Sequence, residues 1–162
     1  MIGSVVSINI SENKGERKKP VNQAWELVEG CGLKNDGHAN LSPNAQDEKS
    51  HRQVSLLAME SIEKMQQLGL AVVPGNFAEN ITTQGIDLLS FEIGTHLSVG
   101  TQVILRISQI GKVCHDRCAI YYQAGDCVMP REGIFAEVIK GGMIEAGDEV
   151  KAIALAEINL MR

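Results

Sequence analysis

The sequence predicts a mainly β protein of the α+β class, a barrel or folded sheet with a few short helices packed outside. Short runs rich in apolar and β-branched residues recur along the chain, and glycines separate them at regular intervals. Only one segment has the spacing of an amphipathic helix. A chain of 162 residues is long enough for one proper core. We therefore expect a single domain over residues 1–162.

The N-terminal third alternates strand-like runs with loops. SVVSINI, from Ser4 to Ile10, is rich in β-branched residues and predicts a strand. QAWELVEG, from Gln23 to Gly30, predicts another, with Trp25 on one face. From Cys31 to His51 the chain is dominated by Gly, Asn, Asp, Ser and Pro, which predicts a loop. Loops of this length are often functional.

The rest of the chain predicts one helix and several short strands. The helix extends from about Leu56 to Gly69, where the glycine is placed to end it. Residues 76–111 predict short strands between glycines. Residues 133–158 predict a short segment, a Gly-Gly turn, a Gly-Asp turn and a final strand. The apolar residues at helical spacing are Leu57, Ile62, Met65 and Leu68.

Composition and charge exclude several classes of protein. Fifteen Lys and Arg residues against twenty Asp and Glu give a net charge of −5, which argues against binding to nucleic acid. No apolar run has the length that a membrane span requires. The N-terminal charges follow the apolar residues, the reverse of a secretory signal. We therefore expect a cytoplasmic protein whose cysteines are thiols.

A short basic run stands out against the acidic composition. It is typical of a solvated loop, and the alternative is a clamp for a small anion. The run consists of Lys14, Arg17, Lys18 and Lys19.

Three of the four cysteines gather in one short stretch, at Cys114, Cys118 and Cys127. On a helix, the first two would lie on the same face. Cations near a thiol favour the thiolate, which is the nucleophile and the soft-metal ligand. The neighbouring cations are Lys112, His115 and Arg117.

Two further interpretations of these cysteines remain open. Free cysteines are often buried as small apolar residues, and Cys31, between two glycines, is best explained in that way. Cys114, Cys118, Cys127 and a histidine could form a structural zinc site, although zinc ligands usually come in two close pairs and only one is present.

Three groups of polar residues could bind a ligand. Asp36 and His38 lie in a glycine-rich turn, as a base and its orienting partner or as a structural pair. Arg52 opens an apolar run and needs a partner, either a carboxylate of the fold or the phosphate of a ligand. Asn80 and Thr82 share one side of a strand. They could contact a ligand or satisfy backbone groups at a barrel rim.

Several motifs occur together in a fixed order. Gly-Leu-x-x-Asp-x-His-Ala begins at Gly32, Arg-Gln-Val-Ser-Leu-Leu at Arg52, and Gly-Asn-Phe-x-Glu-Asn-Ile at Gly75. Gly-Ile-Asp-Leu, Ile-Ser-Gln before a cysteine, and Gly-Ile-Phe-Ala-x-Val with a Gly-Asp turn follow. This order resembles the MOSC domain, which is named for the C-terminal region of molybdenum cofactor sulfurases. The resemblance covers nearly the whole chain.

The resemblance implies a MOSC-type β-barrel and a set of site residues. The cysteine characteristic of the family matches Cys114, with Cys118 close enough to replace it. The catalytic set would then be Cys114, Cys118, Cys127 and His115, with Cys114 as the molybdenum ligand if the metal binds. The positions expected to bind the molybdenum cofactor, molybdopterin, are Asn80, Thr82, Arg52, Asp36, His38, Lys19 and Arg131.

The family includes sulfurase domains that pass sulfur to the molybdenum cofactor, and reductases that hold the cofactor through a cysteine thiolate. We expect a sulfur carrier or sulfur-transfer protein associated with this cofactor. The chain has no pyridoxal-phosphate desulfurase domain, so a cysteine desulfurase-type partner would load the sulfur, and the cofactor or a molybdoenzyme would accept it. The alternatives are a reductase component for N-oxygenated compounds and a structural zinc scaffold.

Overall fold

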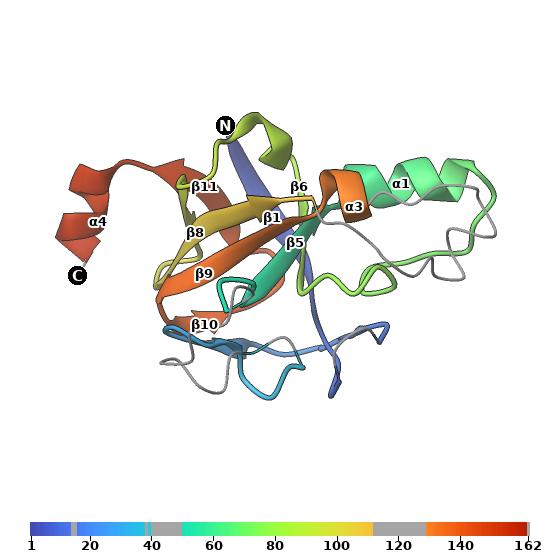
Figure 1. Cartoon of the computed structure of the whole chain (residues 1–162), viewed down its shortest axis with the longest axis horizontal. Helices are drawn as coiled ribbons and strands as arrows, with labels where there is room; N and C mark the ends of the chain where they lie inside the picture. Colours follow the sequence, from blue (N-terminus) through green and yellow to red (C-terminus); the bar gives the residue numbers. More distant parts are fainter. Residues whose placement is uncertain (14–15, 38, 40–49, 112–128, 162) are drawn as a thin grey trace.

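The computed structural model describes residues 1–13, 16–37, 39, 50–111 and 129–161. Its centre is a group of strands, and two of its helices lie on opposite sides of that group (Figure 1). These are helix α1 (Met59–Gln67) and helix α4 (Leu155–Met161).

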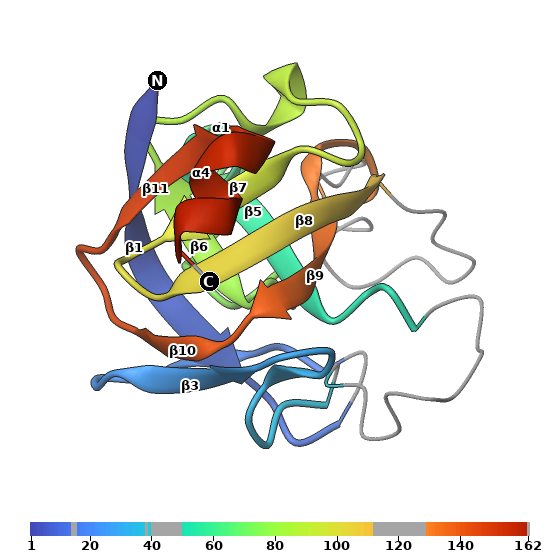
Figure 2. The same ribbon diagram turned by 90° about the vertical axis from the view of Figure 1, so that its left-hand side faces the viewer.

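Seven strands of the described chain form a closed ring, in which each strand pairs with the next (Figure 2). The neighbours are antiparallel, except that β5 (Val54–Ala58) and β6 (Ile81–Gln84) are parallel. This ring confirms the predicted barrel. In order around the barrel, the strands are β1 (Ile2–Ile10), β6 (Ile81–Gln84), β5 (Val54–Ala58), β9 (Ile134–Lys140), β8 (Val103–Ile110), β7 (His96–Val99) and β11 (Glu149–Ile153).

The apolar core has one layer inside the barrel and another outside it. Along β9, Ile134 and Ala136 join the interior cluster, whereas Phe135 between them packs on the outside. This alternation follows from the two-residue period of a strand. The outer layer is completed by Leu57 of β5 and Ile62 of α1, so β5 and β9 are buried on both faces.

Helix α1 begins at Met59, three residues later than the predicted start at Leu56. The preceding residues Val54–Ala58 form a strand that pairs with both β6 and β9. A short apolar run fits a buried strand as well as a buried helix, which explains the error. The predicted end is close, because Gly69 has a left-handed φ of 89° just after the helix.

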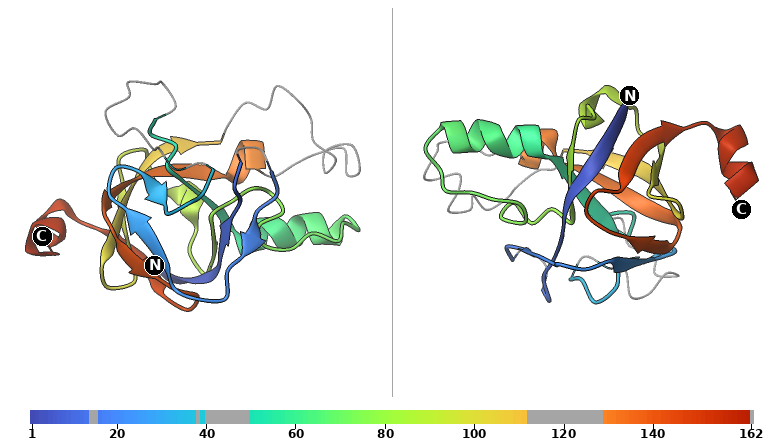
Figure 3. Two further views of the ribbon diagram at one scale, coloured as in Figure 1. Left: turned by 90° about the horizontal axis from the view of Figure 1, so that it is seen from below. Right: turned by 180° about the vertical axis from the view of Figure 1, so that it is seen from behind.

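A smaller sheet lies across one end of the barrel (Figure 3). It contains β10 (Gly142–Ile144), β3 (Trp25–Val28) and β4 (Gly32–Leu33). The predicted strand around Trp25 is therefore confirmed, although it is shorter than expected. A further short strand, β2 (Lys19–Pro20), pairs with the end of β1.

The C-terminal region differs from the prediction in its last residues. β11 ends at Ile153, and the chain then forms α4, where a strand was expected to continue. Ile158 of this helix is buried against Ile104 and Ile153. The remaining helical segments are η1 (Leu88–Ser90) and α3 (Met129–Glu132). Within the described chain, we find no helix that combines the length and the apolar character of a membrane span.

Candidate functional site

The cysteine-rich stretch is the segment between Gly111 and Gly133, and its two ends meet at the edge of the barrel. β8 and β9 pair as far as Ile110 and Ile134, and the next hydrogen bond runs from Gly111 N to Gly133 O over 2.7 Å. Gly111 has a left-handed φ of 70°, which favours glycine. The point at which the chain leaves β8 therefore lies beside the point at which it enters β9. The predicted residues Cys114, His115, Cys118 and Cys127 lie outside the described residues.

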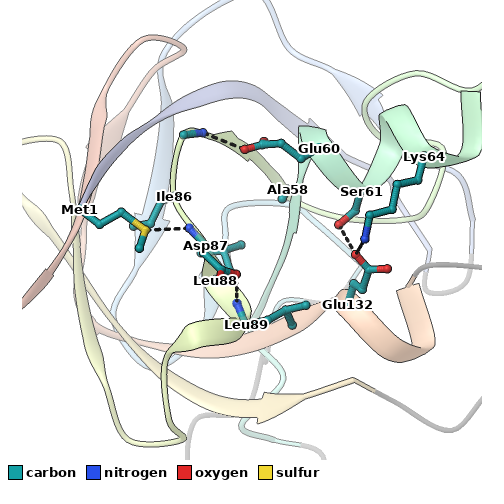
Figure 4. Close-up of a pocket in the computed structure, with 11 residues that line it drawn as sticks. Met1, Ala58, Glu60, Ser61, Lys64, Ile86, Asp87, Leu88, Leu89 and Glu132 are labelled. Carbon is teal, nitrogen blue, oxygen red and sulfur yellow. Dashed lines mark hydrogen bonds and ion pairs between the residues drawn. The ribbon is translucent and has the colours of Figure 1, made fainter. Parts of the chain in front are cut away.

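Helix α3 fastens the downstream end of this stretch to α1. Glu132 Oε1 accepts hydrogen bonds from Ser61 Oγ and from Lys64 Nζ, each over 2.8 Å (Figure 4). Because Glu132 directly precedes Gly133, the point at which the chain returns to the barrel is fixed from the helix side as well.

Arg52 is half-buried over the outer faces of β8 and β9, where it contacts Gln109 and Phe135. Its Nε donates to Gln109 Oε1 over 2.8 Å, and the carbon of its guanidinium lies 5.2 Å from the centre of the Phe135 ring. Among the described residues, the two outer nitrogens of Arg52 have no hydrogen-bond or ion-pair partner. The guanidinium is thus held over an aromatic ring, and a forked pair of donors is left for an anion.

A β-bulge brings the neighbouring side chains to Arg52. The pairing of β8 with β9 shifts between Ile107 and Gln109, so Ser108 is the extra residue. Bulges redirect side chains in this way. Ser108 Oγ donates to His51 O over 3.0 Å and lies 2.9 Å from His51 Nδ1. We call His51, Arg52, Ser108 and Gln109 the rim site.

The sequence had indicated only Arg52 of the rim site as a ligand-binding residue. Ser108 and Gln109 were missed as functional candidates. Their only signal is that they are consecutive polar residues in the strand ILRISQI, which is otherwise apolar except for Arg106, and this signal does not reveal which segment they contact.

Asn80 and Thr82 lie elsewhere, in a buried network at the start of β6. Ser55 N donates to Asn80 Oδ1 over 3.0 Å, and Asn80 Nδ2 donates to Asn9 O over 3.2 Å. Thr82 Oγ1 donates to Glu79 Oε2 over 2.8 Å. We call Asn9, Ser55, Glu79, Asn80 and Thr82 the inner polar cluster. All five residues are 0% exposed, so their polar groups serve one another and the backbone.

Glu79 is the carboxyl group of this cluster. Burial raises its pKa above the usual value, and hydrogen bonds from the backbone of Gly75, from Thr82 and from the backbone of Phe77 lower it in part. The carboxyl group of Glu79 therefore holds its proton more tightly in the folded protein than it does when it is exposed to water.

Asp36 forms a buried ion pair with Lys18. The Lys18 Nζ to Asp36 Oδ1 distance is 2.7 Å, and both side chains are fully buried. Asp36 Oδ1 also accepts from Ser11 N over 3.0 Å. The interpretation of the basic run as a solvated loop or an anion clamp is thus wrong for Lys18. Lys19 and Arg131 are exposed, and His38 lies outside the described residues.

A pocket of about 510 Å³ opens beside α1, and no residue of the rim site is among its lining residues (Figure 4). Apolar residues such as Ile86 contribute to its walls together with three carboxylates, Glu60, Asp87 and Glu132, and one cation, Lys64. Such a lining does not favour an anionic ligand. Within the described ranges, no group of three or more His, Cys, Asp or Glu side chains could hold a metal ion.

Comparisons with known proteins agree with this barrel. No curated protein matched the chain. The YuaD protein of Bacillus subtilis shares the fold with a TM-score of 0.74 at 18% identity, over 93% of this chain and 94% of YuaD. YiiM from Geobacillus stearothermophilus has a TM-score of 0.64 at 17% identity, over 94% of this chain and 75% of YiiM.

YiiM from Escherichia coli has a TM-score of 0.63 at 19% identity, over 95% of this chain and 70% of that protein. At these identities the three structures show a common fold. The family model of the MOSC domain matches residues 36–151, which include the rim site and most of the barrel. The chain therefore belongs to the MOSC domain family.

Proposed function

We propose that this protein is a sulfur carrier or sulfur-transfer protein associated with the molybdenum cofactor, in which Cys114 carries sulfane sulfur. The MOSC family is associated with that cofactor, and this chain belongs to the family. The observation that carries the proposal is the rim site. Arg52 has a vacant pair of donors, and its Nε is linked through the side chain of Gln109 to Gly111, where the cysteine-rich stretch begins.

Chain length supports bringing Cys114 and Arg52 into one site. Cys114 follows Gly111 by three residues in the sequence. Three residues of extended chain span at most about 11 Å. Gly111 is in turn linked to Arg52 through the side chain of Gln109. A ligand held by Arg52 would therefore be near the thiol.

Loading would begin when the Cys114 thiolate attacks the outer sulfur of a donor persulfide. The donor's S–S bond breaks, the donor leaves as a thiol, and Cys114 becomes a persulfide. Release would follow attack of Cys118 or Cys127 on the Cys114 sulfur, which forms a disulfide and expels hydrosulfide to the acceptor. An external thiol then reduces the disulfide.

The partners follow from the same chemistry. The donor would be a cysteine desulfurase-type protein, since we expect no pyridoxal phosphate within this chain. The acceptor would be the molybdenum cofactor or a molybdoenzyme. The cations near the thiol, which would favour its ionised form, are Lys112, His115 and Arg117.

Among the described residues, Arg52 fits the cofactor best. When bound, the cofactor supplies a thiophilic metal and a phosphate, and a planar fork of donors suits the phosphate. Lys19 and Arg131 are exposed cations that could assist. Asp36, Asn80 and Thr82 are less suited, because their polar groups already bond within the protein.

Mass spectrometry after treatment with a persulfide donor tests the carrier proposal. We expect a gain of about one sulfur mass, located on Cys114. Cys114→Ser should abolish the gain. Cys31→Ser is the matched control, because Cys31 is a partly exposed cysteine between β3 and β4, and it should leave the gain intact. Absence of the added sulfur from Cys114 would refute the proposal.

A second candidate is a cofactor-binding component of a reductase for N-oxygenated compounds, with Cys114 as a molybdenum ligand. The two vacant donors of Arg52 favour this candidate, because a reductase component must keep a phosphate-bearing cofactor bound and not contact it only during transfer. Reconstitution with the molybdenum cofactor should give an absorbance that Cys114→Ser abolishes. A spectrum unchanged by this substitution would contradict direct ligation.

A further inference from the structure

We infer that Gln109 is the positioning residue of an oxyanion site, in which it aims the two outer nitrogens of Arg52 at a phosphate-like group. The inference rests on the proposed function and deepens it. It names the residue that would determine how well Arg52 binds an anion, and it assigns that role to a side chain that carries no charge.

The first step is the orientation of the Gln109 amide. Its Oε1 accepts from Arg52 Nε over 2.8 Å, and its Nε2 donates to Gly111 O over 2.7 Å. A flipped amide would set its NH₂ group against the Nε–H of Arg52 and its oxygen against a carbonyl. Both contacts would be lost. The two partners therefore fix the amide in one orientation.

The second step is the orientation of Arg52. Phe135 lies against its guanidinium, and Gln109 binds the inner nitrogen, Nε. These contacts orient the group, and both outer nitrogens remain without a partner among the described residues. Two parallel N–H donors match two oxygens of a phosphate or sulfate group.

The third step is the charge of Arg52. No carboxylate of the described chain pairs with it. By contrast, Arg106, which lies on β8 with Gln109, is 3.7 Å from Glu137 on β9. An anion bound at Arg52 would thus meet an uncompensated positive charge, whereas one at Arg106 would compete with a carboxylate.

Calorimetric titration with inorganic phosphate tests the inference. The variants are Gln109→Met, Arg52→Lys and the double variant. Methionine keeps the length of the side chain but removes both hydrogen bonds, and lysine keeps the charge but removes the fork. Gln102→Met is the matched control, because Gln102 also accepts a hydrogen bond, from Met143 N, away from the rim site. Arg106→Gln is the control for loss of an arginine.

We expect Gln109→Met to weaken phosphate binding about tenfold, as loss of a hydrogen bond to a charged group implies. In the Arg52→Lys background it should have little further effect, because the two residues act as a unit. The controls should bind as the unmodified protein does. The Nε–H proton resonance of Arg52, assigned by its absence from Arg52→Lys, should exchange faster with water in Gln109→Met.

Several results would overturn the inference. One is an unmodified protein that does not bind phosphate. Others are additive losses in the double variant, or an Arg52 Nε–H signal indifferent to Gln109→Met. Sulfur loading of Cys114 is the separate readout of the proposed function. If loading persists while phosphate binding is absent, the oxyanion site fails and the carrier proposal stands. If phosphate binds as expected and Cys114 takes no sulfur, the reverse holds.

Discussion

The inner polar cluster and the rim site are both polar, but they use their hydrogen bonds differently. In the inner polar cluster every residue is fully buried, and the side chains bond to one another and to the backbone. In the rim site Arg52 is half-buried and only one of its three nitrogens is bonded within the described chain. A polar residue is therefore a better candidate for binding a ligand when the fold orients its side chain but leaves some of its hydrogen-bonding groups without a partner.

The largest effect is expected from Asn80→Ala. This change leaves Ser55 N and Asn9 O without the Asn80 side chain in a buried place, which should lower the free energy of unfolding by about 3 kcal/mol. Urea unfolding measures the loss. Phosphate affinity of the folded variant should remain unchanged.

Arg52→Ala is the matched variant in the rim site. It removes the contact with the Phe135 ring and the hydrogen bond to Gln109. It should lower the free energy of unfolding by about 1 kcal/mol, while phosphate binding is lost. If Asn80→Ala were the variant that kept its stability and lost phosphate, the distinction between the two regions would be wrong.

A smaller effect is expected from Gly111→Ala at the start of the cysteine-rich stretch. Gly111 has a φ of 70°, and an alanine there should lower the free energy of unfolding by about 1 kcal/mol. Gly69→Ala is the control, since Gly69 has a φ of 89° and open space around it. Both variants should lose similar stability in urea, but only Gly111→Ala should weaken phosphate binding. Equal phosphate affinity in the two would contradict a role for Gly111 in the rim site.

The smallest effect is expected from pH, because hydrogen bonds offset part of the burial of Glu79. Its pKa is raised on folding, so the folded protein binds the proton more tightly than the unfolded chain. The contribution of Glu79 to stability is thus fully present below the unfolded pKa of about 4.5 and is lost as pH rises through the folded pKa.

Urea unfolding of the unmodified protein and of Glu79→Gln measures this contribution, because titration of other groups cancels in the difference. The stability of the unmodified protein relative to Glu79→Gln should fall as pH rises from about 4.5. A difference that stays flat or rises with pH would show that burial does not dominate at Glu79.

Much of the fold could be predicted because strand signals are local. The β-branched run at Ser4–Ile10 and the glycine turns near the C-terminus each identify their own structure. The start of α1 could not be predicted, because Val54–Ala58 is apolar on both faces and only its pairing with β6 and β9 makes it a strand. The helix after Ile153 was missed for a similar reason: packing of Ile158 against Ile104 is not local.

Of the rim site, the sequence indicated Arg52, because a cation at the head of an apolar run needs a partner. That Arg52 binds a ligand stays a prediction. Gln109 was not indicated, because its role depends on a bulge and on a contact 57 residues away in the chain. For Asn80 and Thr82, alternation along a strand predicts a shared side, but it does not reveal that both side chains are fully buried and bond within the protein.

The hydrogen bond between Gly111 and Gly133 has a consequence for how the molecule could diversify. It joins the two chain ends that flank residues 112–128, and the entropic cost of joining two chain ends grows slowly with the number of residues between them. Insertions, deletions or whole exchanges between residues 112 and 128 should leave the ring of strands intact. The sequence of residues 112–128 could then vary without loss of stability in the barrel.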